Sequence, residues 1–251
     1  MDVSLKGKVA LVTGGSRGIG LGIARGLAEC GCAVALTYVR NKEMAEKSIQ
    51  DMAAFGALAI AVHLVVEERQ SVQKAMKTVS SELGSVNILV NNAAIAQEKP
   101  FETITDEDWD LVLATNLRGP FACIQEVLPD MLASGWGRII NISSIGGQWG
   151  GLNQVHYAAA KAGLINLTRS MAKIYSHKGI TCNAIAPGLI ATDMSTAELE
   201  TEAGKEKVKH IPASRLGNVE EVAATVAFLC TDGASYITGQ TLNLNGGMYF
   251  G

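Results

Sequence analysis

The stretch "KVALVTGGSRGIG", residues 8–20, decides the fold of this protein. Its first half is an apolar run with the length and composition of a short β-strand. A glycine-rich loop follows directly, with glycines at positions 14, 18 and 20, and a helical pattern then extends over 18–30. A strand, a tight turn and a helix in this order predict the beginning of a βαβ unit.

The same alternation continues along all 251 residues. Strand-like runs lie at 8–13, 33–38, 58–64, 86–92, 137–143, 180–187 and 241–247. Helical stretches lie between them, at 18–30, 42–55, 68–83, 105–134, 155–177 and 218–231. This order predicts the α/β class: one Rossmann-type, doubly wound domain over 1–251, with a mostly parallel sheet of about seven strands and helices on both faces.

The composition excludes several classes of protein. Hydrophobic residues make up 48% and charged residues 18%, which is typical of a globular domain rather than a disordered chain or a coiled coil. A net charge of −3 argues against a nucleic-acid binder. No apolar window approaches the ~20 residues of a membrane span, and the five cysteines lack zinc-site spacing. We expect a cytoplasmic protein without metal or membrane segment, whose thiols stay reduced.

The glycine loop is a candidate phosphate cradle. Glycine permits a tight turn and close backbone approach to a pyrophosphate, and the N–H groups that begin a helix favour an anion. The spacing is G-x-x-x-G-x-G rather than G-x-G-x-x-G, and plain turn chemistry is the alternative. The candidate cofactor contacts here are Gly14, Ser16, Arg17, Gly18 and Ile19.

The end of the second strand-like run predicts which dinucleotide binds. NAD sites commonly hold the ribose 2′-hydroxyl with an acidic side chain at this place, where this chain has Tyr38. Arg40 follows, Arg17 lies in the glycine loop, and guanidinium groups bind phosphate bidentately. The sequence therefore favours NADP(H), unless both arginines are merely solvated.

A tyrosine and a lysine stand four residues apart in "HYAAAKAGL", residues 156–164. On a helix this spacing places Tyr157 and Lys161 on one face, and a nearby ammonium lowers the pKa of a phenol. The tyrosine then becomes a usable general acid for a ketone. Ser144, at the end of a strand-like run, can hold the substrate oxygen; Ser143 is the competing choice, but adjacent strand residues face opposite sides.

Five motifs in this order resemble the short-chain dehydrogenase/reductase family: "TGGSRGIG", "NNAA", "NISS", "YAAAK" and "APGLIATDM". Within that family, "IPASRLGNVEEVAATVAFLCTD" and "SYITGQTLNLNGGMYFG" are similar to β-ketoacyl-ACP reductases. The resemblance implies an NADPH-dependent enzyme that reduces a 3-oxoacyl thioester to an alcohol. The alternatives are a small ketone, diketone, sugar-derived or cyclic substrate, or a binding protein without catalysis.

The resemblance also implies roles for individual residues. Tyr157 protonates the carbonyl oxygen, Ser144 orients it, and Lys161 lowers the pKa of Tyr157 and binds the nicotinamide ribose. Asn116 holds a water that extends the proton relay; without the family, it reads as a helix-interior amide. The remaining implied contacts are Asn92 near the adenosine ribose, the Val66 backbone at the adenine, and Ile190 and Thr192 at the carboxamide.

Three departures from the family pattern bear on the substrate and the cofactor. Ala94 replaces the glycine of "NNAG", and Val65 replaces a polar residue expected at the adenine. The segment "AIAQEKPFETITDEDW" looks more like that of general ketone reductases. Trp149, Gln154 and His156 are expected to shape the substrate pocket, although Trp149 could equally be a packing residue.

Two expectations concern mobile parts and assembly. The polar segment 188–217 leaves the end of a strand and is expected to be a substrate lid, with a surface excursion as the alternative. The family resemblance implies a homotetramer, in which the helices at 105–134 and 155–177 pair across a twofold axis. The expected partner is an acyl-thioester or other small-molecule substrate, including one on acyl carrier protein.

Overall fold

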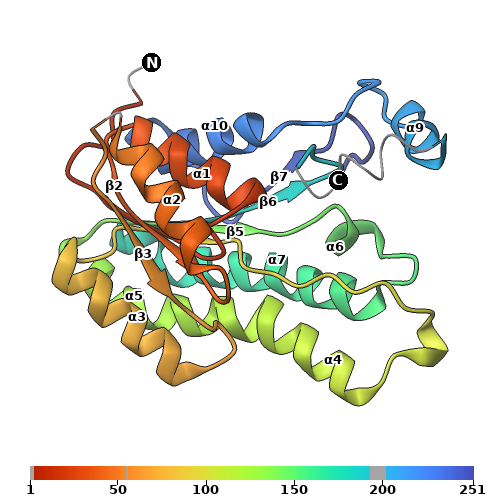
Figure 1. The fold of residues 1–251 in the computed structure, drawn as a ribbon, viewed down its shortest axis with the longest axis horizontal. Coiled ribbons are helices and arrows are strands. Elements are labelled where there is room, and N and C mark those ends of the chain that lie inside the picture. Colours follow the sequence, from red (N-terminus) through yellow and green to blue (C-terminus); the bar gives the residue numbers. More distant parts are fainter. Residues whose placement is uncertain (1–2, 55, 193–201) are drawn as a thin grey trace.

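The computed structural model describes residues 3–54, 56–192 and 202–251. Its centre is a seven-stranded parallel sheet in the order β3-β2-β1-β4-β5-β6-β7, which confirms the predicted α/β class (Figure 1). The strands are β1 (Val9–Val12), β2 (Ala33–Tyr38), β3 (Ala59–His63), β4 (Ile88–Asn91), β5 (Gly137–Ile142), β6 (Ile180–Pro187) and β7 (Thr241–Leu244).

Helices cover both faces of this sheet, as Figure 1 shows. The α-helices of the described chain are α1 (Gly18–Glu29), α2 (Lys42–Ala53), α3 (Arg69–Glu82), α4 (Asp106–Leu113), α5 (Gly119–Ser134), α6 (Gly146–Trp149), α7 (Val155–Tyr175), α9 (Glu202–Lys209) and α10 (Val219–Cys230), of which α9 lies away from the sheet (Figure 1). In β1, Ala10 and Val12 pack into one core with α1 and α10, whereas Val9 and Leu11 pack into another with α3 and α5. Strands buried on both sides explain the continuous apolar runs of the sequence.

The strand order reverses between β1 and β4, whose neighbours lie in opposite directions along the sheet. In open α/β sheets, ligands bind outside the carboxyl ends of the strands at such a switch point. The loops after β1, β4, β5 and β6 therefore define the edge at which a site is expected.

The helix predicted at 105–134 is interrupted. A capping box formed by Thr105 and Asp108 begins α4, and a π-helical turn at Ala114–Arg118 separates α4 from α5. Such wide turns are rare and are frequent at functional sites. This one contains Asn116, which is fully buried.

The predicted lid is only partly described. The predicted lid, 188–217, includes α9, but its residues 193–201 lie outside the described residues.

In the part of the chain that the structure describes, every helix is too short or too polar to cross a membrane.

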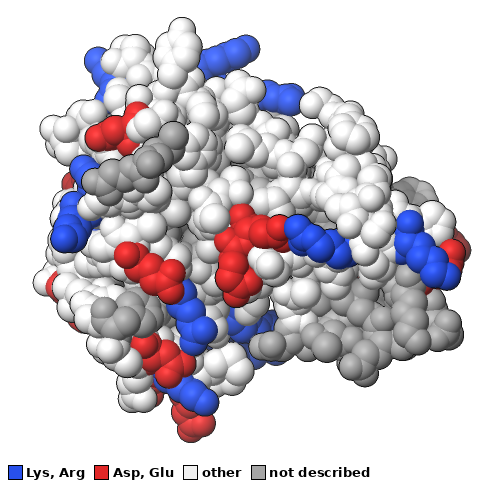
Figure 2. Space-filling view, turned by 90° about the horizontal axis from the view of Figure 1, so that it is seen from above, with Lys and Arg blue, Asp and Glu red and all other residues white. Residues whose placement is uncertain are grey.

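Surface charge is mixed on the face that Figure 2 presents. Basic and acidic side chains are interspersed there among larger uncharged areas, and the visible side chains form no extended basic patch. That face offers no continuous positive surface for a polyanion.

Candidate active site

The glycine loop between β1 and α1 has the geometry of a phosphate cradle. Gly14 and Gly18 adopt φ values of +62° and +51°, which side chains rarely tolerate. The Gly14 amide donates to Thr37 Oγ1 at 3.0 Å, which ties the loop to β2. No side chain caps the start of α1 within the described ranges, so its first amides can meet an anion.

Residues after β4 hold this loop from the other side. Asn92 Nδ2 donates to the carbonyl oxygens of Thr13 and Gly14, at 3.0 and 3.1 Å. The amides of Asn92 and Ala93 both donate to Thr13 Oγ1 at 3.0 Å. The Asn92 side chain thus supports the loop, and Ala94, which replaces the family's glycine, is exposed.

The candidate residues for the adenosine end lie around the end of β2. Tyr38 is half-buried and meets His63 edge to face, with ring centroids 5.7 Å apart. Arg17 and Arg40 are exposed, and neither forms an ion pair within the described ranges. Two exposed guanidinium groups and an absent carboxylate fit a phosphate on the ribose.

The hydroxyl and amine groups predicted for catalysis meet where β5 ends beside α7. Ser144 Oγ accepts from the Gly146 amide at 3.1 Å, and Ser144 acts to lower the pKa of the Tyr157 phenol. Lys161 Nζ donates to the carbonyl oxygen of Ile142 at 2.7 Å and lies 5.6 Å from the ring centroid of Tyr157. The hydroxyl of Ser143, the competing choice, instead donates to the Lys161 carbonyl oxygen at 3.0 Å. The structure therefore brings together Ser144, Tyr157 and Lys161.

The pKa of Tyr157 departs from the value expected from sequence. Burial raises it, and the hydrogen bond from Ser144 acts in the opposite direction. Burial also lowers the pKa of Lys161 to about 8. In this structure desolvation therefore outweighs the expected attraction between phenolate and ammonium.

Asn116 uses both polar groups of its side chain in the same cleft. Its Oδ1 accepts from the Ile95 amide at 2.9 Å, and its Nδ2 donates to the Ile95 carbonyl oxygen at 2.8 Å. The π-helical turn aims this amide at the segment after β4. Its role in holding a water stays a prediction.

Comparisons with known proteins agree with this geometry. A family model described as "Enoyl-(Acyl carrier protein) reductase" matches residues 14–249. The chain belongs to the short-chain dehydrogenase/reductase family. It is 46% identical over 242 residues to the 3-oxoacyl-[acyl-carrier-protein] reductase FabG of Staphylococcus aureus (strain N315), covering 96% of this chain and 98% of that one. With the FabG of Aquifex aeolicus (strain VF5) the identity is 42% over 250 residues, or 99% and 100% of the two chains.

Solved structures show the same fold. A putative gluconate dehydrogenase from Agrobacterium tumefaciens superposes with a TM-score of 0.94 at 34% identity, over 99% of this chain and 98% of that one. A structure described as gox2181 gives the same TM-score and identity, over 98% and 97%. As a short-chain dehydrogenase/reductase, the chain is an NAD(P)-dependent oxidoreductase, which fits the uncapped helix and the glycine loop.

The other residues predicted to contact the cofactor or the substrate differ in how exposed they are. Ile190 is buried, and Thr192 approaches the glycine loop, since a Cβ on Gly18 would lie 3.6 Å from its methyl group. Trp149 is 51% exposed and meets Tyr249 edge to face. That these three residues contact cofactor or substrate stays a prediction.

His156, which is expected to help shape the substrate pocket, is completely buried in the structure. Its partner Gln97, together with Lys99 and Asp108, was missed by sequence reasoning. These residues lie close together only in the folded chain, so no short motif marks them. Gln154 is partly buried and donates to Glu98 at 3.2 Å.

The buried Lys161 predicts a pH-dependent stability. Because its pKa falls from 10.5 to about 8, the unfolded chain binds one more proton than the folded chain between these values. The free energy of unfolding therefore rises with pH in this window. Relative to Lys161→Met, the unaltered protein should gain about 2 kcal/mol between pH 7 and about pH 9.5.

Urea unfolding of both proteins at the two pH values measures this gain. The comparison cancels the titration of the buried cysteines, which both proteins share. A difference in stability that does not change with pH would contradict the assignment of a charged, buried lysine.

Proposed function

We propose that this protein reduces a 3-oxoacyl thioester to the corresponding secondary alcohol with NADPH. The observation that carries the proposal is the Ser144–Tyr157–Lys161 cluster beside the glycine loop, at one edge of the sheet. The identity to FabG reductases over nearly the whole chain supports the substrate class. The substrate is carried by coenzyme A or by acyl carrier protein.

A reduced nicotinamide cofactor held by the glycine loop and Lys161 would supply the hydride for the carbonyl carbon. Tyr157 donates its phenolic proton to the carbonyl oxygen, and Ser144 holds that oxygen with its hydroxyl group. Lys161 binds the ribose and favours the phenolate that is left. Asn116 holds the Ile95 segment and the water from which the proton is replaced.

The remaining proposed contacts place the cofactor along the edge of the sheet. Arg17 and Arg40 bind the 2′-phosphate, the glycine loop binds the pyrophosphate, and Val66 meets the adenine. Ile190 and Thr192 would bind the carboxamide; residues 193–201 of the proposed lid lie outside the described residues. Val66 is packed closely against Gly119, since a Cβ on Gly119 would lie 2.9 Å from the Val66 side chain.

A substrate and cofactor panel tests this function. We expect acetoacetyl thioesters to be reduced, with kcat/KM at least about tenfold higher for NADPH than for NADH, because two guanidinium–phosphate contacts are lost with NADH. Arg40→Ala should narrow this ratio, and Lys42→Ala, a nearby exposed cation, is the control. NADH equal to or better than NADPH would contradict the cofactor assignment.

A second function has one specific observation in its favour. The structural match to a putative gluconate dehydrogenase, together with the unusual segment after β4, favours a small polar ketone or alcohol. Activity on such substrates or on diketones, with none on acyl thioesters, selects this alternative.

We propose a cytoplasmic homotetramer. Exposed apolar side chains on α4, α5 and α7 support pairing of these helices: Trp109, Leu111, Phe121, Leu132 and Ile174. Contiguous apolar side chains on a surface are typical of protein–protein contacts.

A further inference from the structure

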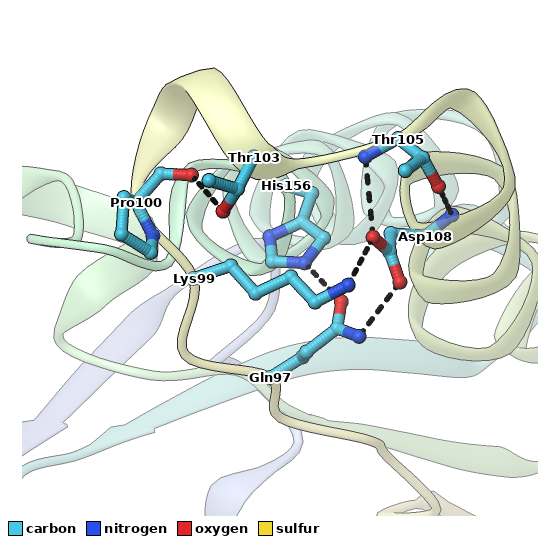
Figure 3. Close-up of polar contacts among 7 residues, drawn as sticks. All are labelled: Gln97, Lys99, Pro100, Thr103, Thr105, Asp108 and His156. Carbon is cyan, nitrogen blue, oxygen red and sulfur yellow. Dashed lines mark hydrogen bonds and ion pairs between the residues drawn. The ribbon is translucent and has the colours of Figure 1, made fainter.

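A buried histidine adjoins the proposed catalytic tyrosine but takes no part in the proposed chemistry. His156 is fully buried on α7, and its Nε2 lies 2.8 Å from Gln97 Oε1. Figure 3 shows the ring pointing at the segment that follows β4, on which Gln97 and Lys99 lie. The contact joins residues 59 positions apart, so it links the first turn of α7 to the segment that follows β4.

Asp108 determines which atoms donate and which accept in the hydrogen bonds that link it to Gln97 and His156. Asp108 accepts hydrogen bonds from Gln97 Nε2 at 2.7 Å, Lys99 Nζ at 2.5 Å and the Thr105 amide at 3.1 Å (Figure 3). Because an ionised carboxylate only accepts, the nitrogen of Gln97 must face Asp108 and its oxygen must face His156. His156 Nε2 therefore carries the proton.

The other ring nitrogen shows that this histidine is not there for packing. Its Nδ1 is buried and has no hydrogen-bond partner in the described part of the chain. A buried nitrogen without a partner disfavours folding, and a leucine of similar volume would avoid that cost. What histidine adds at this position is the single hydrogen bond to Gln97.

The hydrogen bond from His156 to Gln97 holds the distal half of the segment that follows β4; this segment is called the wall below. The half nearer the glycine loop is held independently, Ala93 by Thr13 and Ile95 by Asn116. The half around Gln97 and Lys99 is held by hydrogen bonds to His156 and Asp108. In addition, the Lys99 amide donates to the Asn153 carbonyl oxygen at 2.8 Å. Loss of the histidine therefore loosens the wall on the side away from the cofactor.

We propose that His156 is a positioning residue that acts through Gln97 to fix the substrate side of the cleft. The inference rests on the proposed function, because the wall it fixes is the wall of a ketone-binding cleft. It predicts that substrate affinity depends on the donor at position 156, whereas cofactor binding does not.

Two substitutions at one position separate this role from packing. His156→Leu keeps the volume and removes the donor, whereas His156→Gln keeps an N–H at similar reach. The leucine variant should raise the KM for acetoacetyl thioester at least about fivefold, with kcat and the Kd for NADPH within about twofold. Its Tm should not fall, and the glutamine variant should restore the KM.

A matched control lies in the same connection. Thr103→Ala removes an exposed hydrogen bond from Thr103 Oγ1 to the Pro100 carbonyl oxygen, and should leave the KM unchanged. Hydrogen exchange of the Lys99 amide gives a readout without turnover, and it should accelerate only in His156→Leu.

The outcomes are distinct. An unaltered KM in His156→Leu, or a joint loss of Tm, NADPH affinity and kcat, overturns the positioning role. If the unaltered protein reduces no carbonyl substrate at all, the proposed function fails. In that case faster exchange at Lys99 in His156→Leu still supports the contact, and unchanged exchange overturns it.

Discussion

Replacing Tyr157 with phenylalanine is expected to lower kcat by about 10²–10⁴-fold, the usual contribution of a positioned general acid. The change removes the phenolic oxygen of a side chain whose ring centroid lies 5.6 Å from Nζ of the buried Lys161. Without it the developing alkoxide has no proton donor, although Ser144 still offers a hydrogen bond. NADPH should bind within about twofold of its normal affinity, because the glycine loop is untouched.

Single-turnover kinetics and a fluorescence titration of NADPH measure the two effects separately. Tyr175→Phe is the matched control, since Tyr175 ends the same helix and packs in the core beneath the sheet. It should retain normal turnover. If Tyr157→Phe turned over at a third or more of the normal rate, another group would have to be the acid.

The pH dependence of this acid is where sequence reasoning was least adequate. The spacing of Tyr157 and Lys161 correctly predicted that the two side chains lie close together on one face of the helix, because helical periodicity fixes the shared face. It gave the wrong direction for the pKa of Tyr157 in this structure. Charges can be counted from a sequence, but burial depends on what packs around a group, and burial prevails here.

The fold was predictable because its signals are local. Apolar runs and glycine turns mark each strand, and the predicted sheet agrees with β1 to β7 within two or three residues at the strand ends. The π-helical turn at Ala114–Arg118 was missed for the opposite reason. A wide turn leaves the apolar pattern of the flanking helices intact, so only the backbone hydrogen bonds reveal it.

The contrast between local and tertiary signals also explains which residues of the site could be predicted from the sequence. Ser144 and Tyr157 follow from the strand end and the helix face on which they lie. The bond between His156 and Gln97 is tertiary, and a polar residue beside a catalytic one gives no sign of whether it faces the pocket or the core. The sequence therefore predicted that His156 helps to shape the substrate pocket, but not that its ring is buried against Gln97.

Replacing Gly20 with alanine is expected to weaken cofactor binding by up to about 100-fold. A Cβ at this position would lie 2.3 Å from the Gly14 carbonyl oxygen and 2.5 Å from Asn92 Nδ2. Neither neighbour can yield alone, since Asn92 Nδ2 donates to Thr13 and Gly14 and so joins β4 to the loop. The loop and the first turn of α1 must separate, which moves the amides away from the pyrophosphate.

Overpacking of this kind costs about 1–3 kcal/mol, and the upper end corresponds to about a 100-fold weaker Kd for NADPH. Titration calorimetry and a thermal melt measure the loss of affinity and the accompanying fall in Tm. Gly233→Ala is the control, because a Cβ there would lie at an ordinary contact distance of 3.6 Å from Thr231 Oγ1, and it should change neither quantity. Normal NADPH affinity in Gly20→Ala would show that the loop binds the cofactor without its close approach to α1.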